Sequence, residues 1–564
     1  MEALDWLVIG VFFLALIGII VWVVRQKQND SADYFLGGRD ATWLAIGASI
    51  FASNIGSEHL IGLAGAGASS GMAMAHWEIQ GWMILILGWV FVPFYTRSMV
   101  YTMPEFLERR YNPQSRTILS VISLVSYVLT KVAVTVYAGG LVFQQVFGIK
   151  ELWGIDFFWI AAIGLVVLTA LYTIFGGMKS VLYTSVLQTP ILLLGSLIIL
   201  VLGFKELGGW DEMMRVCGAV TVNDYGDTMT NLIRSNDDAN FPWLGALIGS
   251  AIIGFWYWCT DQFIVQRVLS GKNEMEARRG TIFGAYLKLL PVFLFLIPGM
   301  IAFALHQKYI GAGGEAFLPM LANGTANADA AFPTLVAKLL PAGVKGLVVC
   351  GILAALMSSL ASLFNSSAML FTIDFYKRFK PETPEKKLVG IGQIATIVIV
   401  VLGILWIPIM RSVGDVLYTY LQDVQSVLAP GIAAAFLLGI CWKRTSAQGG
   451  MWGLISGMVI GLTRLGAKVY YSNAGEVADS TFKYLFYDMN WLFFCGWMFL
   501  FCIIVVIVVS LATEAPTAEK IQGLVFGTAT KEQKAATRAS WNHWDIIHTV
   551  IILAITAAFY WYFW

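Results

Sequence analysis

Long hydrophobic runs, separated by short polar segments, recur along the whole chain. An α-helix needs about 20 apolar residues to cross a bilayer. The pattern predicts fourteen such spans, which run approximately over Leu4–Val24, Thr42–Ser70, Met74–Tyr101, Ile118–Phe147, Phe157–Phe175, Val181–Leu202, Pro242–Val268, Ile282–His306, Val344–Phe375, Leu388–Ile409, Val413–Leu438, Gly449–Val469, Asn490–Leu511 and Ile546–Phe563. The predicted fold is therefore an all-α membrane protein.

The second predicted span carries polar and small residues near its middle. Within FASNIGSEHLIGLAGAGASSG they are Asn54, Gly56, Ser57, Glu58 and His59. Lipid offers no partner to unwound backbone, so a broken helix persists only inside protein or beside a wet cavity, where transporters bind solute and ion. Close packing against a neighbouring helix also explains the small residues, but it leaves Glu58 and His59 unexplained.

A second unusual span lies five spans later. Pro242–Val268, which contains GSAIIGFWYWCTDQFIVQR, starts with small residues and departs from the pattern at Trp256–Gln262. Two interrupted helices at matching positions indicate an inverted repeat with a site near the middle of the membrane. We therefore expect a 5+5 inverted-repeat core with two broken helices. The predicted units are 1–41 (first helix and inner loop), 42–240 and 241–444 (the two five-helix repeats) and 445–564 (three additional helices).

Composition and loop charge agree with this interpretation. Hydrophobic residues make up 58% of the chain and charged residues 13%, against about 25% charged in soluble domains. With the N-terminus outside, 23 of the 36 lysines and arginines fall in inner loops. The positive-inside rule then predicts a multi-pass protein of the cell (inner) membrane with both termini on the outer side.

Ionisable and aromatic residues within the spans are candidates for solute binding. Glu78 and Lys288 lie on different predicted helices, where a carboxylate and an ammonium would suit a ligand covered in hydroxyls. Trp256, Tyr257 and Trp258 add flat apolar faces, which fit the C–H faces of a sugar. A buried Glu78–Lys288 pair that only fixes packing is the alternative.

Hydroxyls on the span Val344–Phe375 are candidates for cation binding. Ser359, Ser362 and Ser366 share one helical face, beside Ser358 and Ser367. Hydroxyl and carbonyl oxygens suit a hard cation, although small hydroxyl residues also serve helix packing. The chain has no GxxxxGK[ST] sequence and no constellation typical of an enzyme. We therefore expect a non-enzymatic protein that draws energy from an ion gradient.

Several segments resemble the sodium/glucose cotransporters of the sodium:solute symporter family. They are FASNIGSEHLIGLAGAG, TMPEFLERRY, ALYTIFGGMKSVLYTSVLQT, WYWCTDQFIVQRVLSGKN, YLKLLP, PGM, SSLASLFNSSAMLFTIDFYK and LAPGIAAAFLLGICWKR, and they extend from about Ala32 to Arg444. The short loops and the short C-terminal tail are typical of a bacterial member.

The resemblance implies specific site residues. It implies a sugar site of Asn54, His59, Glu78, Tyr257, Trp258, Lys288 and Gln422. It implies an inner gate at Tyr257 and an outer gate of Leu63, Trp77 and Tyr418. It implies a sodium site built from backbone carbonyls of Ala52, Ile55 and Ala355 and from the hydroxyls of Ser358 and Ser359.

Two positions depart from the family pattern. Ser185 stands where the sugar carriers usually have Asp, and Ala361 takes a position among the helix hydroxyls. A second sodium would meet mostly neutral oxygens there, so we expect one sodium per sugar. Gly254 stands where a galactose carrier of the family has Asn, which would shift sugar preference.

The sequence therefore predicts sodium-coupled import of a hexose, glucose or galactose, by alternating access. The expected partners are a monosaccharide, sodium ions and the lipid bilayer, with no nucleic acid. Two alternatives remain open at this point: a symporter for myo-inositol or another polyol, and a sugar sensor that transports no sugar.

Overall fold

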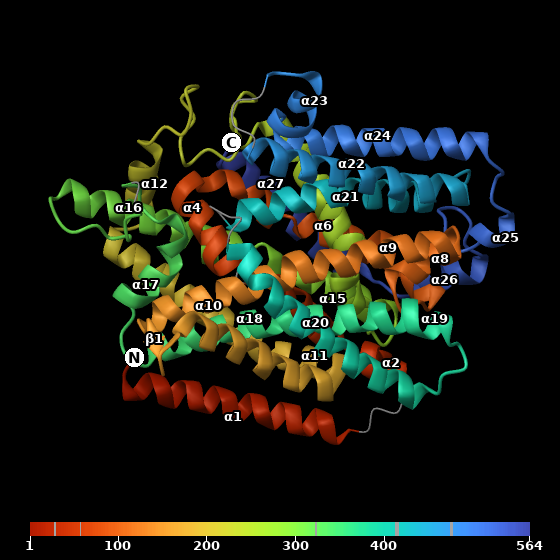
Figure 1. Cartoon of the computed structure of the whole chain (residues 1–564), viewed down its shortest axis with the longest axis horizontal. Coiled ribbons are helices and arrows are strands. Elements are labelled where there is room, and N and C mark those ends of the chain that lie inside the picture. Colours follow the sequence, from red (N-terminus) through yellow and green to blue (C-terminus); the bar gives the residue numbers. More distant parts are fainter. Residues whose placement is uncertain (27–29, 57, 322–323, 412–416, 474–477) are drawn as a thin grey trace.

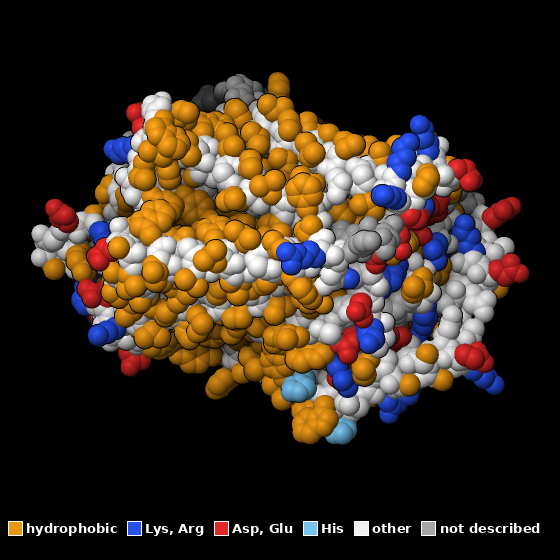
Figure 2. All heavy atoms as spheres, turned by 90° about the horizontal axis from the view of Figure 1, so that it is seen from below, with side chains coloured by type: hydrophobic (Ala, Val, Ile, Leu, Met, Phe, Trp, Pro, Cys, Tyr) orange, Lys and Arg blue, Asp and Glu red, His pale blue; other side chains and the backbone are white. Residues whose placement is uncertain are grey.

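The computed structural model is built almost entirely from helices, and it describes residues 1–26, 30–56, 58–321, 324–411, 417–473 and 478–564. The long helices lie side by side and run roughly along one common direction (Figure 1). Figure 2 shows a broad band of hydrophobic side chains across the middle of one face, with charged side chains gathered toward both ends of that direction. Such a band is what a bilayer requires of the surface that contacts its lipid tails.

The first half of the chain contains the elements from α1 to α12. Its elements, where η marks a 3₁₀ or π-helical turn, are α1 (Ala3–Arg25), α2 (Ser31–Leu36), η1 (Gly37–Arg39), α3 (Trp43–Asn54), η2 (Glu58–Leu63), α4 (Ala64–Ser70), η3 (Gly71–Met74), α5 (Ala75–Glu78), α6 (Gly81–Ile86), η4 (Leu87–Phe91), α7 (Val92–Ser98), α8 (Met103–Arg110), α9 (Pro113–Ser126), η5 (Tyr127–Val132), α10 (Ala133–Phe147), β1 (Glu151–Leu152), β2 (Ile155–Asp156), α11 (Phe157–Leu207) and α12 (Trp210–Gly218). The two short strands pair antiparallel.

The second half begins with another interrupted helix. Its elements are α13 (Trp243–Gly254), η6 (Phe255–Thr260), α14 (Gln262–Leu269), α15 (Glu274–Lys288), η7 (Val292–Leu296), α16 (Ile297–Gly311), η8 (Ala328–Ala330), α17 (Ala331–Leu339), α18 (Val344–Met369), η9 (Leu370–Tyr376), α19 (Lys377–Phe379), α20 (Glu385–Arg411), α21 (Leu417–Cys441), α22 (Ala447–Asn473), α23 (Thr481–Lys483), η10 (Tyr484–Asp488), α24 (Trp491–Ala512), α25 (Ala518–Ile521), α26 (Lys531–Ala539) and α27 (His543–Tyr562).

Within the described residues, ten helical stretches are long and apolar enough to cross a membrane. This makes the chain a multi-pass membrane protein, while the count of fourteen spans and the inverted repeat stay predictions. One of the ten, α11, has 51 residues, about twice what a bilayer needs. Gly177 interrupts it with φ 52° and ψ −149°, and a β-carbon there would lie 2.4 Å from the carbonyl oxygen of Tyr34. The interruption falls between the two spans predicted for this region.

Both helices expected to be broken are interrupted within the predicted stretches. Helix α3 ends at Asn54, Ile55 is extended with φ −78° and ψ 104°, and the helix resumes at Glu58. Helix α13 passes into the π-turn η6, Asp261 is extended, and α14 begins at Gln262. Helix α18 packs against both α3 and α14, which places its serines beside the first break.

Candidate functional site

Backbone carbonyls at the end of α3 face hydroxyls of α18. The Oγ of Ser359 donates to the carbonyl oxygen of Ser53 at 2.9 Å and to that of Ile55 at 3.2 Å. The Oγ atoms of Ser53 and Ser362 lie 2.6 Å apart. Because α3 stops at Asn54, the Ile55 carbonyl is released from regular helical bonding and is available to a ligand.

The five residues predicted to bind sodium all lie in this buried region. Ala52 and Ile55 belong to the end of α3, and Ala355, Ser358 and Ser359 to α18, and each is at most 2% exposed. The Oγ of Ser358 lies 3.3 Å from that of Ser185, which also donates to the carbonyl oxygen of Val181 at 2.6 Å. Carbonyl and hydroxyl oxygens are ligands that a hard cation prefers; the assignment of these five residues to a site for sodium, which would be cargo here, stays a prediction.

A cavity beside the first break is lined by residues from seven helical elements, α3, η2, α5, α13, η6, α15 and α21, together with Gln80. The space it offers to the centres of water-sized molecules is about 40 Å³. The lining residues are Asn54, Glu58, His59, Trp77, Glu78, Gln80, Ile253, Gly254, Tyr257, Trp258, Lys288, Gln422 and Gln425. All seven residues predicted to bind sugar are in this set, so the fold brings them together, although their role stays a prediction.

Lys288 is at the centre of the polar contacts in this cavity. Its Nζ donates to Oε2 of Glu78 at 2.6 Å and to Oδ1 of Asn54 at 3.1 Å. The Nδ2 of Asn54 donates to the hydroxyl of Tyr257 at 3.1 Å, and Nε2 of His59 lies 3.3 Å from Oε2 of Glu78. A ligand with several hydroxyls could exchange its own hydrogen bonds for these without leaving a buried charge unpaired.

Aromatic rings form one wall of the cavity. The Nζ of Lys288 lies 5.3 Å from the ring centre of Trp258, and Trp258 meets Tyr257 edge to face at 4.9 Å. Tyr257 also lines a second cavity, with Lys131, Phe263 and Ser359 among its walls. Tyr257 thus contributes to the walls of both cavities, and its role as the inner gate stays a prediction.

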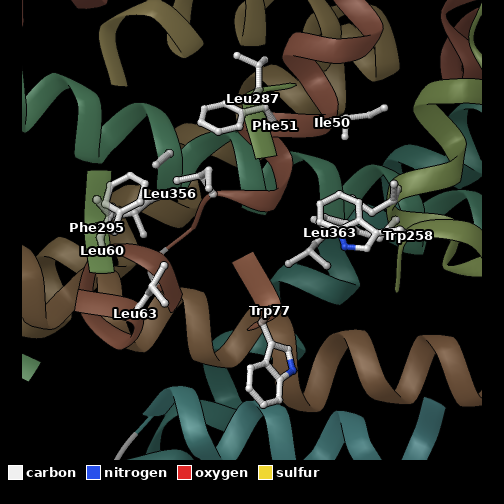
Figure 3. Close-up of a cluster of buried hydrophobic side chains, with 14 of the residues drawn as sticks. Ile50, Phe51, Leu60, Leu63, Trp77, Trp258, Leu287, Phe295, Leu356 and Leu363 are labelled. Carbon is white, nitrogen blue, oxygen red and sulfur yellow. The ribbon is translucent and has the colours of Figure 1, made fainter. Parts of the chain in front are cut away.

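The predicted outer-gate residues occupy two further positions in the buried cluster. Leu63 ends η2 and is fully buried, and Trp77 lines the cavity and stacks on Trp491 at 5.6 Å. Figure 3 shows both within the same group of buried side chains as Trp258. The side chain of Tyr418 lies outside the described residues, as does Ser57.

The sequence interpretation singled out Glu58 within the second span but gave it no role, and it assigned no role to Gln80, Gln425 or Lys131. Glu58, Gln80 and Gln425 line the cavity, and Lys131 binds Oδ2 of Asp261 at 2.5 Å beside the second one. The neighbours of Glu58, Gln80 and Gln425 in the chain, His59, Glu78 and Gln422, were assigned to the site. Helical spacing was an available signal only for Gln425, which lies three residues after Gln422.

Comparison with known proteins identifies the family. The model of the sodium:solute symporter family matches residues 34–457. The chain is 36% identical over 542 residues to sodium/myo-inositol cotransporter 2 of Homo sapiens, covering 94% of this chain and 79% of the relative. It is 36% identical over 537 residues to sodium/glucose cotransporter 4 of Danio rerio, covering 92% and 80%.

A solved structure supports the fold. The substrate-bound, outward-open structure of a Na⁺-coupled sialic acid symporter matches with a TM-score of 0.73 at 22% identity, over 92% of this chain and 99% of that one. Sodium:solute symporters are transporters and not enzymes, and sodium is the ion that the family couples to its solute. The chain belongs to the sodium:solute symporter family.

Proposed function

We propose that the protein imports a hexose, glucose or galactose, coupled to one sodium ion per sugar. The observation that carries the proposal is the cavity in which Lys288 bonds to Glu78 and Asn54 against the ring of Trp258. Charged donors and acceptors beside an aromatic wall suit a small ring with hydroxyls on its edge and C–H groups on its faces. The adjoining carbonyls and hydroxyls of α3 and α18 offer sodium its ligands.

Coupling follows from the position of the first break. Sodium bound between Ile55 and Ser359 would fix the unwound end of α3 against α18, and Asn54 at that end also contacts the solute cavity. Sodium would therefore order part of the solute site and favour solute binding from the side rich in sodium. Each ligand then raises the affinity of the other by the same factor. Movement of Trp77 and Tyr257 would close and open the two sides in turn.

A myo-inositol symporter is a second candidate, favoured by a specific observation. The chain is 36% identical to a human sodium/myo-inositol cotransporter over nearly its whole length. Inositol is also a six-membered ring with hydroxyls on its edge, and Glu78, Lys288 and Gln422 suit either ring. The same cation site would serve both solutes.

Uptake into proteoliposomes tests these proposals. Labelled glucose, galactose and myo-inositol would be offered under an inward gradient of sodium or of potassium. Accumulation that requires sodium supports symport, and the ranking of the three solutes identifies the cargo. Equal uptake in both salts would indicate a uniporter, and sodium-dependent binding without uptake would indicate a sensor.

A further inference from the structure

Glu58 lies where the cation site and the solute cavity meet. It is the first residue of η2, directly after the break in α3. It lines the solute cavity together with Glu78 and Lys288. It also lines the second cavity, in which Ser359 takes part. No other carboxylate among the described residues is in the lining of both cavities.

The geometry at Gly56 shows how close Glu58 comes to the sodium ligands. A β-carbon placed on Gly56 would lie 2.7 Å from Oε2 of Glu58 and 3.0 Å from Oγ of Ser359. The carboxylate and the hydroxyl therefore approach the same point from two helices. The same Oγ contacts the carbonyl oxygen of Ile55 at 3.2 Å, so three kinds of oxygen ligand converge beside the break.

The nearby lysines already have carboxylate partners. Lys288 pairs with Glu78 at 2.6 Å, and Lys131 pairs with Asp261 at 2.5 Å. In the part of the chain that the structure describes, Glu58 forms no ion pair with another side chain. A carboxylate at membrane depth is costly without a counter-charge, and a bound cation would supply one.

We propose that the carboxylate of Glu58 is a ligand of the transported sodium ion. This inference rests on the proposed function, and it adds one full negative charge to a site otherwise made of neutral oxygens. The lining of the solute cavity holds two carboxyl groups, Glu58 and Glu78, and one ammonium, Lys288, which pairs with Glu78. A sodium ion bound to the Glu58 carboxylate would balance its charge and leave the Lys288–Glu78 pair to receive the solute. Glu58 thereby links sodium occupancy to solute affinity.

The test measures how solute uptake by the variant Glu58→Gln depends on sodium concentration. This substitution keeps the shape of the side chain and removes its charge. In proteoliposomes, the sodium concentration for half-maximal uptake should rise about tenfold or more. The solute KM at saturating sodium should change much less. Glu78→Gln is the matched comparison: it removes the other carboxylate of the cavity and should raise the solute KM more than the sodium requirement.

A binding measurement separates this inference from the proposed function. Purified wild-type protein without solute should have a higher Tm in sodium chloride than in potassium chloride, and Glu58→Gln should lose that difference. Absence of sodium-dependent uptake in the wild type would contradict the proposed function, whereas this Tm difference would still report on Glu58.

Two results with Glu58→Gln would overturn the inference. In the first, the sodium concentration for half-maximal uptake equals that of the wild type. In the second, only the solute KM changes, which would make Glu58 a solute ligand and not a sodium ligand. If Glu58→Gln does not fold, Glu58→Asp replaces it, since it keeps the charge but withdraws the carboxylate by one methylene. An unchanged sodium requirement in Glu58→Asp would also overturn the inference.

Discussion

At the scale of single residues, the Lys288–Glu78 pair is the contact most sensitive to substitution. Lys288 is 3% and Glu78 1% exposed, and removing one partner of such a pair typically costs 3–5 kcal/mol. We expect Lys288→Ala to abolish solute uptake and to lower Tm while leaving a folded protein. Uptake assays and size-exclusion chromatography in detergent measure the two effects.

Lys308→Ala is the control for Lys288→Ala. Lys308 is an exposed lysine near the end of α16, and its Nζ donates only to the carbonyl oxygen of Leu207 among the described contacts. Its removal should leave uptake and Tm nearly unchanged. Wild-type uptake by Lys288→Ala would remove Lys288 from the solute site.

Site residues were predictable from sequence where a polar group stood out within an apolar span. Asn54, Glu78 and Lys288 did so. Gln80 did not, because its place in the cavity depends on a close approach between two helices. Its Nε2 donates to the carbonyl oxygen of Ser250 at 2.8 Å, and a β-carbon on Gly254 would lie 2.4 Å from its Oε1. The hydrophobic pattern of one helix does not show which residues of another helix will contact it.

At the scale of elements, the second half of the first broken helix, which includes α4, packs tightly against α16. A β-carbon on Gly299 would lie 1.9 Å from the carbonyl oxygen of Ala64, and one on Gly67 would lie 2.2 Å from that of Leu296. Gly299→Ala must therefore push α4 and α16 apart. We expect it to cost about 1–3 kcal/mol of stability and to reduce uptake, because α4 continues the helix that carries the site.

Gly311→Ala, in the last position of α16, is the matched control because a β-carbon there meets nothing within 4 Å. Thermal unfolding in detergent and uptake would be measured on both variants. Equal Tm values for Gly299→Ala and Gly311→Ala would contradict tight packing at this contact.

A buried carboxyl group, that of Asp329, lies between α16 and α17 in sequence and contacts α4. Asp329 in η8 lies against Gly65, where a β-carbon would be 2.4 Å from its Oδ1. Burial raises the pKa of Asp329 from 3.8 to about 6. The folded state then binds a proton more tightly than the unfolded state, so this group lowers stability as pH rises from about 4 to 6.

Asp329→Asn removes this titration. We expect the variant to have a higher Tm than the wild type at pH 7.5, with a difference that shrinks toward pH 4. Asp237→Asn, at an exposed aspartate of another loop, should show no such trend. A difference in Tm that is constant between pH 4 and 7.5 would contradict the raised pKa.

The two helix breaks were predictable, but the local geometry around them was not. Polar and small residues in the middle of a span indicated both interruptions. The π-turns η2 and η6 were not expected, since one extra residue per turn leaves the hydrophobic pattern almost unchanged. A π-turn leaves some backbone carbonyls without their usual helical N–H donors. Whether other residues donate to them depends on tertiary packing.

At the scale of the whole molecule, the hydrophobic band and the charged ends agree with the transmembrane interpretation (Figure 2). Composition and run length made the membrane class predictable, because only helices or closed barrels satisfy their backbone in lipid. The number of spans, the side on which each terminus lies and the boundaries of the four predicted units stay predictions. They depend on where the two membrane surfaces lie along each helix, and the length of a hydrophobic run does not determine that position.

The number of ions per solute is a property of the complete transport cycle, and Ser185 bears on it directly. Its hydroxyl is neutral, bonds to Val181 and lies 3.3 Å from Ser358, so a second sodium would find no carboxylate at this position. One charge crossing 100 mV releases about 2.3 kcal/mol, and a tenfold gradient adds about 1.4 kcal/mol. Together they support roughly 500-fold accumulation, whereas two sodium ions would square that ratio.

We therefore expect a charge-to-solute ratio near one, measured from the reversal potential of uptake in proteoliposomes at several solute gradients. Ser185→Asp provides the comparison, because it restores a carboxylate beside Ser358, and a ratio closer to two in this variant would assign the missing second site to that carboxylate. A ratio near two in the wild type would contradict the prediction. It would mean that neutral oxygens, or another carboxylate of the core, hold the second ion.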